Sequence, residues 1–192
     1  GIRAARAALP FVPHVAVFDT AFHATLPPEA YTYAIDAAVA SRYQVRRYGF
    51  HGTSYRYVTR RAAELLGRPL EQLRQVVLHL GNGASAAAVA GGRSINTSMG
   101  MTPLEGLVMG TRSGDLDPAV LVHLQRVGGF DATALDDMLN RSSGLKGLGG
   151  HSDMRDLIRA IDSGDEAAAL AFEVYVHRVQ RYIAAYAADL GG

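Results

Sequence analysis

Short apolar runs separated by glycine turns dominate the middle of the chain. Three of these runs have the length of strands: Val76–Leu80, Ala84–Ala90 and Arg93–Thr97. The turns between them, at Gly81–Gly83 and Gly91–Gly92, are short enough for hairpins. This pattern predicts an antiparallel meander of three strands. Two more runs, His14–Phe18 and Val45–Tyr48, predict additional strands nearer the N-terminus.

Apolar positions at helical spacing predict helices over much of the remaining chain. They are expected at about residues 33–42, from Thr53 or Ser54 to Gly67, and after Asp117-Pro118, Asp131, Ser152 and Gly164. The last helix is the longest, and its apolar face is expected to belong to the core. That face consists of Phe172, Val176, Val179, Ile183, Tyr186 and Leu190. The glycine-rich segment 142–150 is expected to be a flexible loop.

Hairpins followed by helices indicate an α/β protein. The sequence ends directly after a helix, where such a fold normally continues with a strand, so we expect a chain that is incomplete at its C-terminus. A chain of 192 residues, 48% of them hydrophobic, suits one globular domain, or one domain and a fragment. No apolar run approaches the roughly 18 residues of a membrane span, so we expect a cytoplasmic protein without a membrane partner.

Composition excludes several kinds of chemistry. The chain has no cysteine, which rules out disulfides, thiol catalysis and zinc bound by thiolates. Its net charge of +1 argues against a dedicated nucleic-acid binder. Lys146 is the only lysine and lies outside any G-x-x-x-x-G-K-[ST] pattern, so a nucleotide would not be bound by a P-loop.

The turn Gly81-Asn82-Gly83 allows two interpretations. An Asn-Gly pair between apolar runs is typical of a plain hairpin turn. Glycines also allow close approach of the backbone, and successive N–H groups can form an anion nest. The pattern alone favours the plain turn, although the small side chains of Ala84 and Ser85 keep the face of the turn open.

Three polar residues in predicted loops are candidates for chemistry. His51 precedes a predicted helix, where its side chain and the helix N-terminus can meet an anion. Arg112 lies between glycines and serines, so its guanidinium can reach into a cleft. Asp19 follows a predicted strand, where an acid forms a turn or serves a nucleotide or magnesium site. Asp115, close to Arg112, is expected to hold the turn.

Two other interpretations of the polar residues are weaker. Arg46 to Arg61 interleaves basic and aromatic residues, as single-stranded nucleic-acid binders do. However, Arg56, Arg60 and Arg61 fall on a predicted helix, where a solvated face explains them. The histidines show no paired spacing on one element that would indicate a metal site.

Taken together, five blocks of the sequence resemble the acetate kinase family. They are VFDTAFH, RRYGFHGTS, VVLHLGNGAS, INTSMGMTPLEGLVMGTRSGDLDP and SSGLKGLGGHSDMRD, in the order of the family. The resemblance implies a ribonuclease H-like domain of the actin-like ATPase kind, with a mixed sheet that contains the antiparallel meander and with flanking helices. It also implies that residues 1–22 are the end of an N-terminal domain and a hinge, and that residues 23–192 are an incomplete second domain. The implied reaction is reversible transfer of the γ-phosphoryl group from ATP to acetate, with Mg²⁺, in a homodimer.

The resemblance also implies roles for individual residues. Asp19, His51 and Arg112 correspond to catalytic positions, Asp19 acting near the metal and the reacting oxygens. The phosphate loop is His79, Leu80, Gly81, Asn82 and Gly83; a second nucleotide segment is Asp153, Met154 and Arg155; the acetate pocket includes Phe50 and Pro103. Metal ligands are expected outside this chain. Because acetate is already ionised at neutral pH, we expect Asp19 to position charge and not to transfer a proton.

The sequence departs from the family pattern in two ways. Tyr55 replaces the second histidine of GFHGTSH; it keeps a hydrogen-bonding tip, so we expect altered tuning without loss of activity. The chain is also about half the expected length, so we expect it to be inactive alone. Two alternatives stay open: a propionate kinase, which differs mainly in pocket volume, and a non-catalytic nucleotide-binding module with an actin-like fold.

Overall fold

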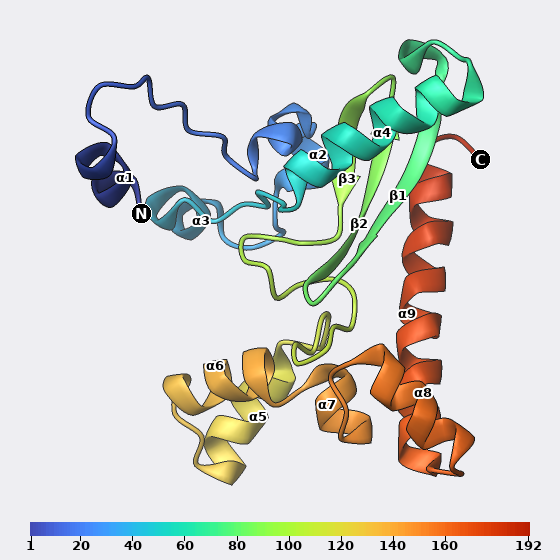
Figure 1. The fold of residues 1–192 in the computed structure, drawn as a ribbon. Coiled ribbons are helices and arrows are strands. Elements are labelled where there is room, and N and C mark those ends of the chain that lie inside the picture. Colours follow the sequence, from blue (N-terminus) through green and yellow to red (C-terminus); the bar gives the residue numbers. More distant parts are fainter.

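The computed structural model describes all 192 residues, and its centre is a three-stranded sheet (Figure 1). Strands β1 (Arg74–Leu80), β2 (Ala84–Ala90) and β3 (Arg93–Thr97) lie in the order β1-β2-β3, and both pairs are antiparallel. The predicted meander is therefore confirmed. The mixed sheet is wrong for this chain, because no other segment pairs with these strands to add a parallel neighbour.

The chain also forms nine α-helices and two 3₁₀ segments. They are α1 (Ile2–Ala8), η1 (Ala21–Thr25), α2 (Pro28–Tyr31), α3 (Ala37–Tyr43), α4 (Gly52–Leu66), η2 (Leu70–Gln72), α5 (Ala119–Gly128), α6 (Ala132–Arg141), α7 (Gly144–Gly149), α8 (Met154–Asp162) and α9 (Glu166–Asp189). Of these, α5 to α8 lie beyond one end of the sheet (Figure 1). No helix has the length and apolarity needed to cross a membrane.

The central strand β2 is buried on both faces because α4 and α9 cover opposite sides of the sheet (Figure 1). Ala86 and Ala88 pack against Tyr186 of α9. The alternate residues Ala87 and Val89 pack against Tyr55 of α4. Period-two alternation sends successive side chains to opposite faces, and the alanines allow both helices to approach closely.

The two N-terminal strand predictions are wrong. Residues 13–18 belong to no helix or strand and pair with none of the three strands, and Val15 and Val17 are exposed. Residues 45–48 also join no ladder. There, the N–H of Arg47 donates to Tyr31 and the N–H of Tyr48 donates to Gly100, both in loops or short helices, so the segment lacks the regular pairing of a strand.

Several helix boundaries differ from the prediction for local reasons. The first predicted helix begins at Ala37, because Asp36 caps it through a bond to the N–H of Val39. Helix α4 begins at Gly52, before the predicted caps Thr53 and Ser54. Helix α8 is capped by Asp153 and not by Ser152. The helices predicted after Asp117-Pro118 and Asp131 are confirmed.

The segment 142–150 is not a flexible loop, since it contains helix α7, which packs against α9. Its glycines permit this contact: a methyl group on Gly149 would lie 3.0 Å from the Cβ of Ala171. The core face of α9 is also rotated from the predicted one. Phe172, Val179, Tyr186 and Leu190 pack inward, but Ile183 is exposed, and the inner face also includes Ala168, Ala171 and Tyr182.

Candidate active site

A tight turn brings Asp19 and His51 together at the start of α4. The backbone N–H of His51 donates to Asp19 Oδ2 at 2.5 Å, and the N–H of Gly52 donates to the carbonyl of Asp19 at 2.9 Å. A methyl group on Gly52 would lie only 2.2 Å from that carbonyl, so glycine is required here. The sequence motif Phe50-His51-Gly52 therefore fixes where the Asp19 carboxylate lies.

His51 adopts a backbone conformation that is rare for a residue with a side chain. Its φ of 59° is left-handed, and only Gln44 shares this property among the non-glycine residues. Buried His23 supports the turn, because its Nε2 bonds to the carbonyl of Phe50 and its Nδ1 to Ser94 Oγ of β3. Strained backbone held in place by its surroundings is typical of functional sites.

Two stacked imidazoles face the glycine loop. The rings of His51 and His79 lie 4.0 Å apart between centroids, at 19° between their planes. Each Nδ1 bonds to a serine hydroxyl: His51 to Ser85 at 2.8 Å and His79 to Ser54 at 2.9 Å. Each Nε2 points at the loop, because methyl groups on Gly83 and Gly81 would lie 3.3 and 3.4 Å from these nitrogens.

Arg112 approaches the same point of the loop from a different segment of the chain. A methyl group on Gly83 would lie 3.5 Å from Arg112 Nη1, which itself donates to the carbonyl of Pro103 at 3.1 Å. The chain thus brings His51, Gly83 and Arg112 together, although they are far apart in sequence. Gly81 and Asn82 of the turn are exposed, so an anion has access to it.

The two residues predicted to form the acetate pocket lie close to Arg112 or to a cluster that Arg112 touches. Phe50 packs against the buried cluster of Ala84, Met99, Leu107 and Met109. The carbonyl of Pro103 accepts from Arg112 Nη1, which also lies 3.9 Å from Sδ of Met109 in this cluster.

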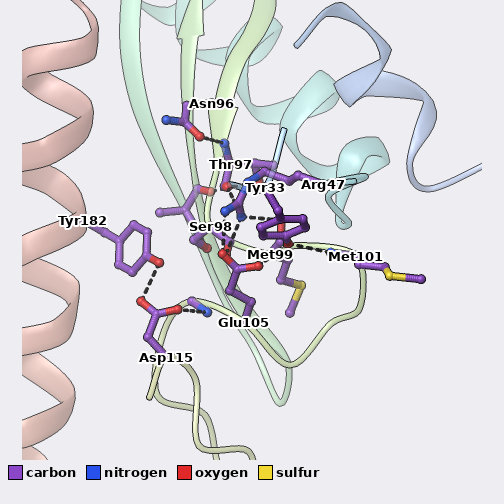
Figure 2. A network of polar contacts seen from close by, with 12 residues as sticks. Tyr33, Arg47, Asn96, Thr97, Ser98, Met99, Met101, Glu105, Asp115 and Tyr182 are labelled. Atoms are coloured by element: carbon purple, nitrogen blue, oxygen red, sulfur yellow. Dashed lines mark hydrogen bonds and ion pairs between the residues drawn. The ribbon is translucent and has the colours of Figure 1, made fainter. Parts of the chain in front are cut away.

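A polar network holds the loop that carries Pro103 (Figure 2). Arg47 Nη1 donates to the carbonyls of Thr97, Ser98 and Met99, and its Nη2 donates to Glu105 Oε1 at 2.5 Å. Tyr33 donates to the other carboxylate oxygen of Glu105. The loop end is tied to α9 through Asp115, which accepts from Tyr182 at 2.7 Å and from the N–H of Gly106 at 2.8 Å. The prediction that Asp115 holds the turn is confirmed.

The second predicted nucleotide segment lies beside Asn82 of the glycine loop. A methyl group on Gly110 would lie 2.8 Å from the carbonyl of Ser152 and 3.6 Å from Asn82 Oδ1. The next residue, Asp153, caps α8 and forms an exposed ion pair with Arg155 at 2.6 Å. This pair lowers the pKa of the Asp153 carboxyl well below its usual range, mainly through hydrogen bonds from Arg155. Met154 packs against the α7–α9 core, leaving Asp153 and Arg155 as the polar groups of the segment.

Electrostatics keeps His51 neutral. Burial, together with the neighbouring His79 and Arg112, lowers the pKa of His51 to about 4 although Asp19 opposes the shift. At neutral pH the ring therefore offers one N–H donor and one acceptor. Burial also lowers the pKa of His23, so it supports the turn as a neutral side chain.

Sequence reasoning missed the residues that support the candidate site. Ser85 bonds to His51, Ser54 to His79, and His23 to the Phe50 carbonyl. All three lie in the quoted sequence blocks, but no spacing along the chain indicated these contacts. Gly110 was not singled out, although it separates Asn82 from Ser152. One signal was available: alternation along β2 places Ser85 on the same face as Ala87 and Val89, toward Tyr55.

Comparison with known proteins identifies the fold and family. The chain superimposes on the crystal structure of Porphyromonas gingivalis acetate kinase with a TM-score of 0.97 and 47% identity, covering all of this chain and 48% of that one. A propionate kinase from Francisella tularensis matches with a TM-score of 0.93 and 46% identity, over 97% of this chain and 48% of that one. The chain is therefore an α/β protein of the actin-like ATPase fold, as predicted.

Sequence comparison agrees and is more specific. The profile of the Acetokinase family matches residues 1–192. An acetate kinase of Leifsonia xyli is 69% identical over 192 residues, and one of Streptomyces coelicolor is 61% identical over 191. The chain belongs to the Acetokinase family. It spans about half the length of these relatives, 48% and 47% respectively.

Proposed function

We propose that the protein containing this chain is an acetate kinase, which transfers the γ-phosphoryl group of ATP reversibly to acetate to give acetyl phosphate and ADP. The observation that carries the proposal is the convergence of His51 Nε2 and Arg112 Nη1 on Gly83. Phosphoryl transfer spreads negative charge over three equatorial oxygens, so fixed cationic and N–H donors contribute most of the catalysis. Family membership and acetate kinases at up to 69% identity support the assignment.

Each site residue then has a defined task. The backbone of His79–Gly83 cradles the phosphates, while Arg112 and His51 donate to the transferring group. Asp153 and Arg155 contact the nucleotide beyond Asn82. Phe50 and Pro103 receive the methyl group of acetate. Asp19 positions charge near the reacting oxygens and exchanges no proton, because the acetate carboxylate is already a nucleophile at neutral pH.

The cofactors proposed are ATP or ADP and Mg²⁺. The exposed glycine turn, with His51 and Arg112 beside Gly83, fits a nucleotide phosphate. Magnesium is usually bound by one or two carboxylates together with substrate phosphates. Asp19, beside His51, would act near the metal without being one of its ligands. No group of three or more acidic, histidine or cysteine side chains forms a metal cage within the chain. Mg²⁺ would neutralise charge on the phosphates, and its protein ligands would come from outside this chain.

The proposal extends to the whole protein. We propose a cytoplasmic homodimer in which residues 1–22 form the end of a preceding domain and a hinge, and residues 23–192 most of a second domain. The exposed side chains of residues 1–18 support a boundary here. The chain alone would not turn over, since it contains part of the site.

The test is Arg112→Ala in the full-length protein. Removing the guanidinium should lower kcat by about 10³-fold, because a charged transition-state donor is lost. Initial rates of ADP formation with acetate measure this. Arg61→Ala is the matched control: Arg61 is exposed and paired with Glu64 on the outer side of α4, so the rate should stay the same. An unchanged rate in Arg112→Ala would favour a non-catalytic nucleotide-binding module.

Propionate kinase is the second candidate, because the propionate kinase from Francisella tularensis shares the fold at nearly the same identity. The two activities differ by one methylene in the pocket, which changes the transition-state free energy by about 1–3 kcal/mol. We expect kcat/KM of the full-length protein to be at least about ten-fold higher for acetate. A higher value for propionate would reassign the substrate.

A further inference from the structure

The hydroxyl of Tyr55 lies in apolar surroundings with a single polar partner. The ring is fully buried, packs with Val77, Ala87 and Val89, and stacks with Phe22 at 6.3 Å between centroids. Its hydroxyl bonds to Ser85 Oγ, which is also fully buried. Burial raises the pKa of Tyr55, so the phenol keeps its proton. Ser85 Oγ in turn bonds to His51 Nδ1 at 2.8 Å, completing a chain of three side chains.

The number of protons decides the direction of the two hydrogen bonds that link Tyr55, Ser85 and His51. Tyr55 and Ser85 each contribute one hydroxyl proton, and there are two contacts to fill. If His51 Nδ1 also carried a proton, three protons would compete for two contacts, and one buried O–H would have no acceptor. Buried donors without acceptors are strongly disfavoured. All groups are satisfied only when Tyr55 donates to Ser85, Ser85 donates to His51 Nδ1, and the imidazole proton is on Nε2.

We propose that Tyr55 and Ser85 are positioning residues that fix His51 as the neutral tautomer with its proton on Nε2, aimed at the glycine loop. This role rests on the proposed function, since it matters for catalysis only if His51 donates to the transferring phosphoryl group. The side of the ring facing Gly83 would otherwise present a lone pair, which repels an anion. Tyr55 thus acts on the reaction through Ser85 and His51 without touching the substrate.

His79 provides an internal contrast. Its Nδ1 bonds to Ser54 Oγ in the first turn of α4, and Ser54 is partly exposed. No buried tyrosine stands behind Ser54, so the serine can donate or accept and water can satisfy its other side. The tautomer of His79 is therefore not fixed in the same way, although the two rings are stacked.

The experiment is nitrogen NMR of the full-length protein with ¹⁵N-labelled histidine side chains, without nucleotide and at neutral pH. His51→Gln identifies the His51 signals. The informative variants are Tyr55→Phe, which removes only the hydroxyl, and Ser85→Ala, which removes the link. Tyr57→Phe is the matched control, because Tyr57 lies on the same helix with its side chain exposed. A proton is located by its one-bond coupling to Nδ1 or Nε2.

We expect the wild type and Tyr57→Phe to carry the His51 proton on Nε2 alone, and both informative variants to show a mixture of tautomers. A proton on Nδ1 in the wild type would overturn the proposal, as would an unmixed Nε2 tautomer in both variants. Kinetics separate this inference from the proposed function. Tyr55→Phe should lower kcat by about ten-fold with little change in KM. A mixed tautomer with unchanged kcat would leave the inference standing and remove His51 from the proposed transition state.

Discussion

Two arginine–carboxylate pairs flank the candidate site, and they differ in burial and in partners. The Arg47 and Glu105 side chains are 16% and 31% exposed, and Arg47 also binds three backbone carbonyls. The Arg155 and Asp153 side chains are 85% and 39% exposed, and the guanidinium of Arg155 bonds only to Asp153. Through its contacts, the first pair holds the loop that carries Pro103 (Figure 2). The second is available to a ligand.

The difference shows that the same chemical pair can serve two purposes. A half-buried guanidinium satisfied by four acceptors cannot turn toward a ligand without leaving those acceptors unpaired. An exposed pair loses little when it opens, because water replaces the lost contact. We therefore interpret Arg47 as a residue that holds the Pro103 loop in place. We interpret Arg155 as one that can exchange Asp153 for a bound ligand.

The largest expected effect on stability is that of Arg47→Ala. This change leaves Oε1 of Glu105 and the carbonyls of Thr97, Ser98 and Met99 without their donor, so the free energy of unfolding should fall by about 3–5 kcal/mol. Denaturant unfolding of the full-length protein measures it. Arg47→Lys should lose less, because an ammonium keeps the charge but not the planar fork. If the free energy of unfolding fell no more than it does when an exposed arginine is replaced, the contrast between the two pairs would be contradicted.

A smaller effect is expected for Tyr33→Phe, which removes one hydrogen bond to Glu105 and one from the N–H of Met101. The free energy of unfolding should fall by about 1–2 kcal/mol. Burial and the Glu105 contact raise the pKa of Tyr33 to about 12 from 10.0. Between these values the unfolded chain loses a proton that the folded one keeps, so the wild type should lose stability as pH rises from 10 to 12. Tyr33→Phe should lose less over the same range.

Local patterns predicted the meander well and the N-terminal strands badly. A glycine turn between apolar runs is a signal contained in a few adjacent residues, and β1–β2–β3 followed from it. The run His14–Phe18 has the same apolar character but pairs with no strand of this chain. An apolar run indicates that its burial is favourable, but it does not indicate which other segment covers it.

The candidate site could be predicted where it follows a motif and not where it depends on distant contacts. Asp19, His51, Arg112 and the glycine loop were all identified, and the structure brings His51, Gly83 and Arg112 together. Their roles stay predictions. The supporting contacts Tyr55–Ser85 and Arg47–Glu105 join residues 30 and 58 positions apart. No local periodicity encodes such pairs, since they depend on how α4 and the Pro103 loop pack on β2 and β3.

The smallest effect on stability is expected for Arg155→Ala. Because the guanidinium of Arg155 bonds only to Asp153 at the surface, the melting temperature of the full-length protein should be unchanged. The KM for ATP should nevertheless rise by roughly ten-fold, because a charge-assisted contact to the nucleotide is lost. Arg141→Ala is the control: the Arg141 side chain is 77% exposed and pairs with Asp137 on α6, away from Arg155, so the change should alter neither quantity. If Arg155→Ala lowered the melting temperature and left KM alone, the pair would be structural, and the distinction from Arg47–Glu105 would be one of degree.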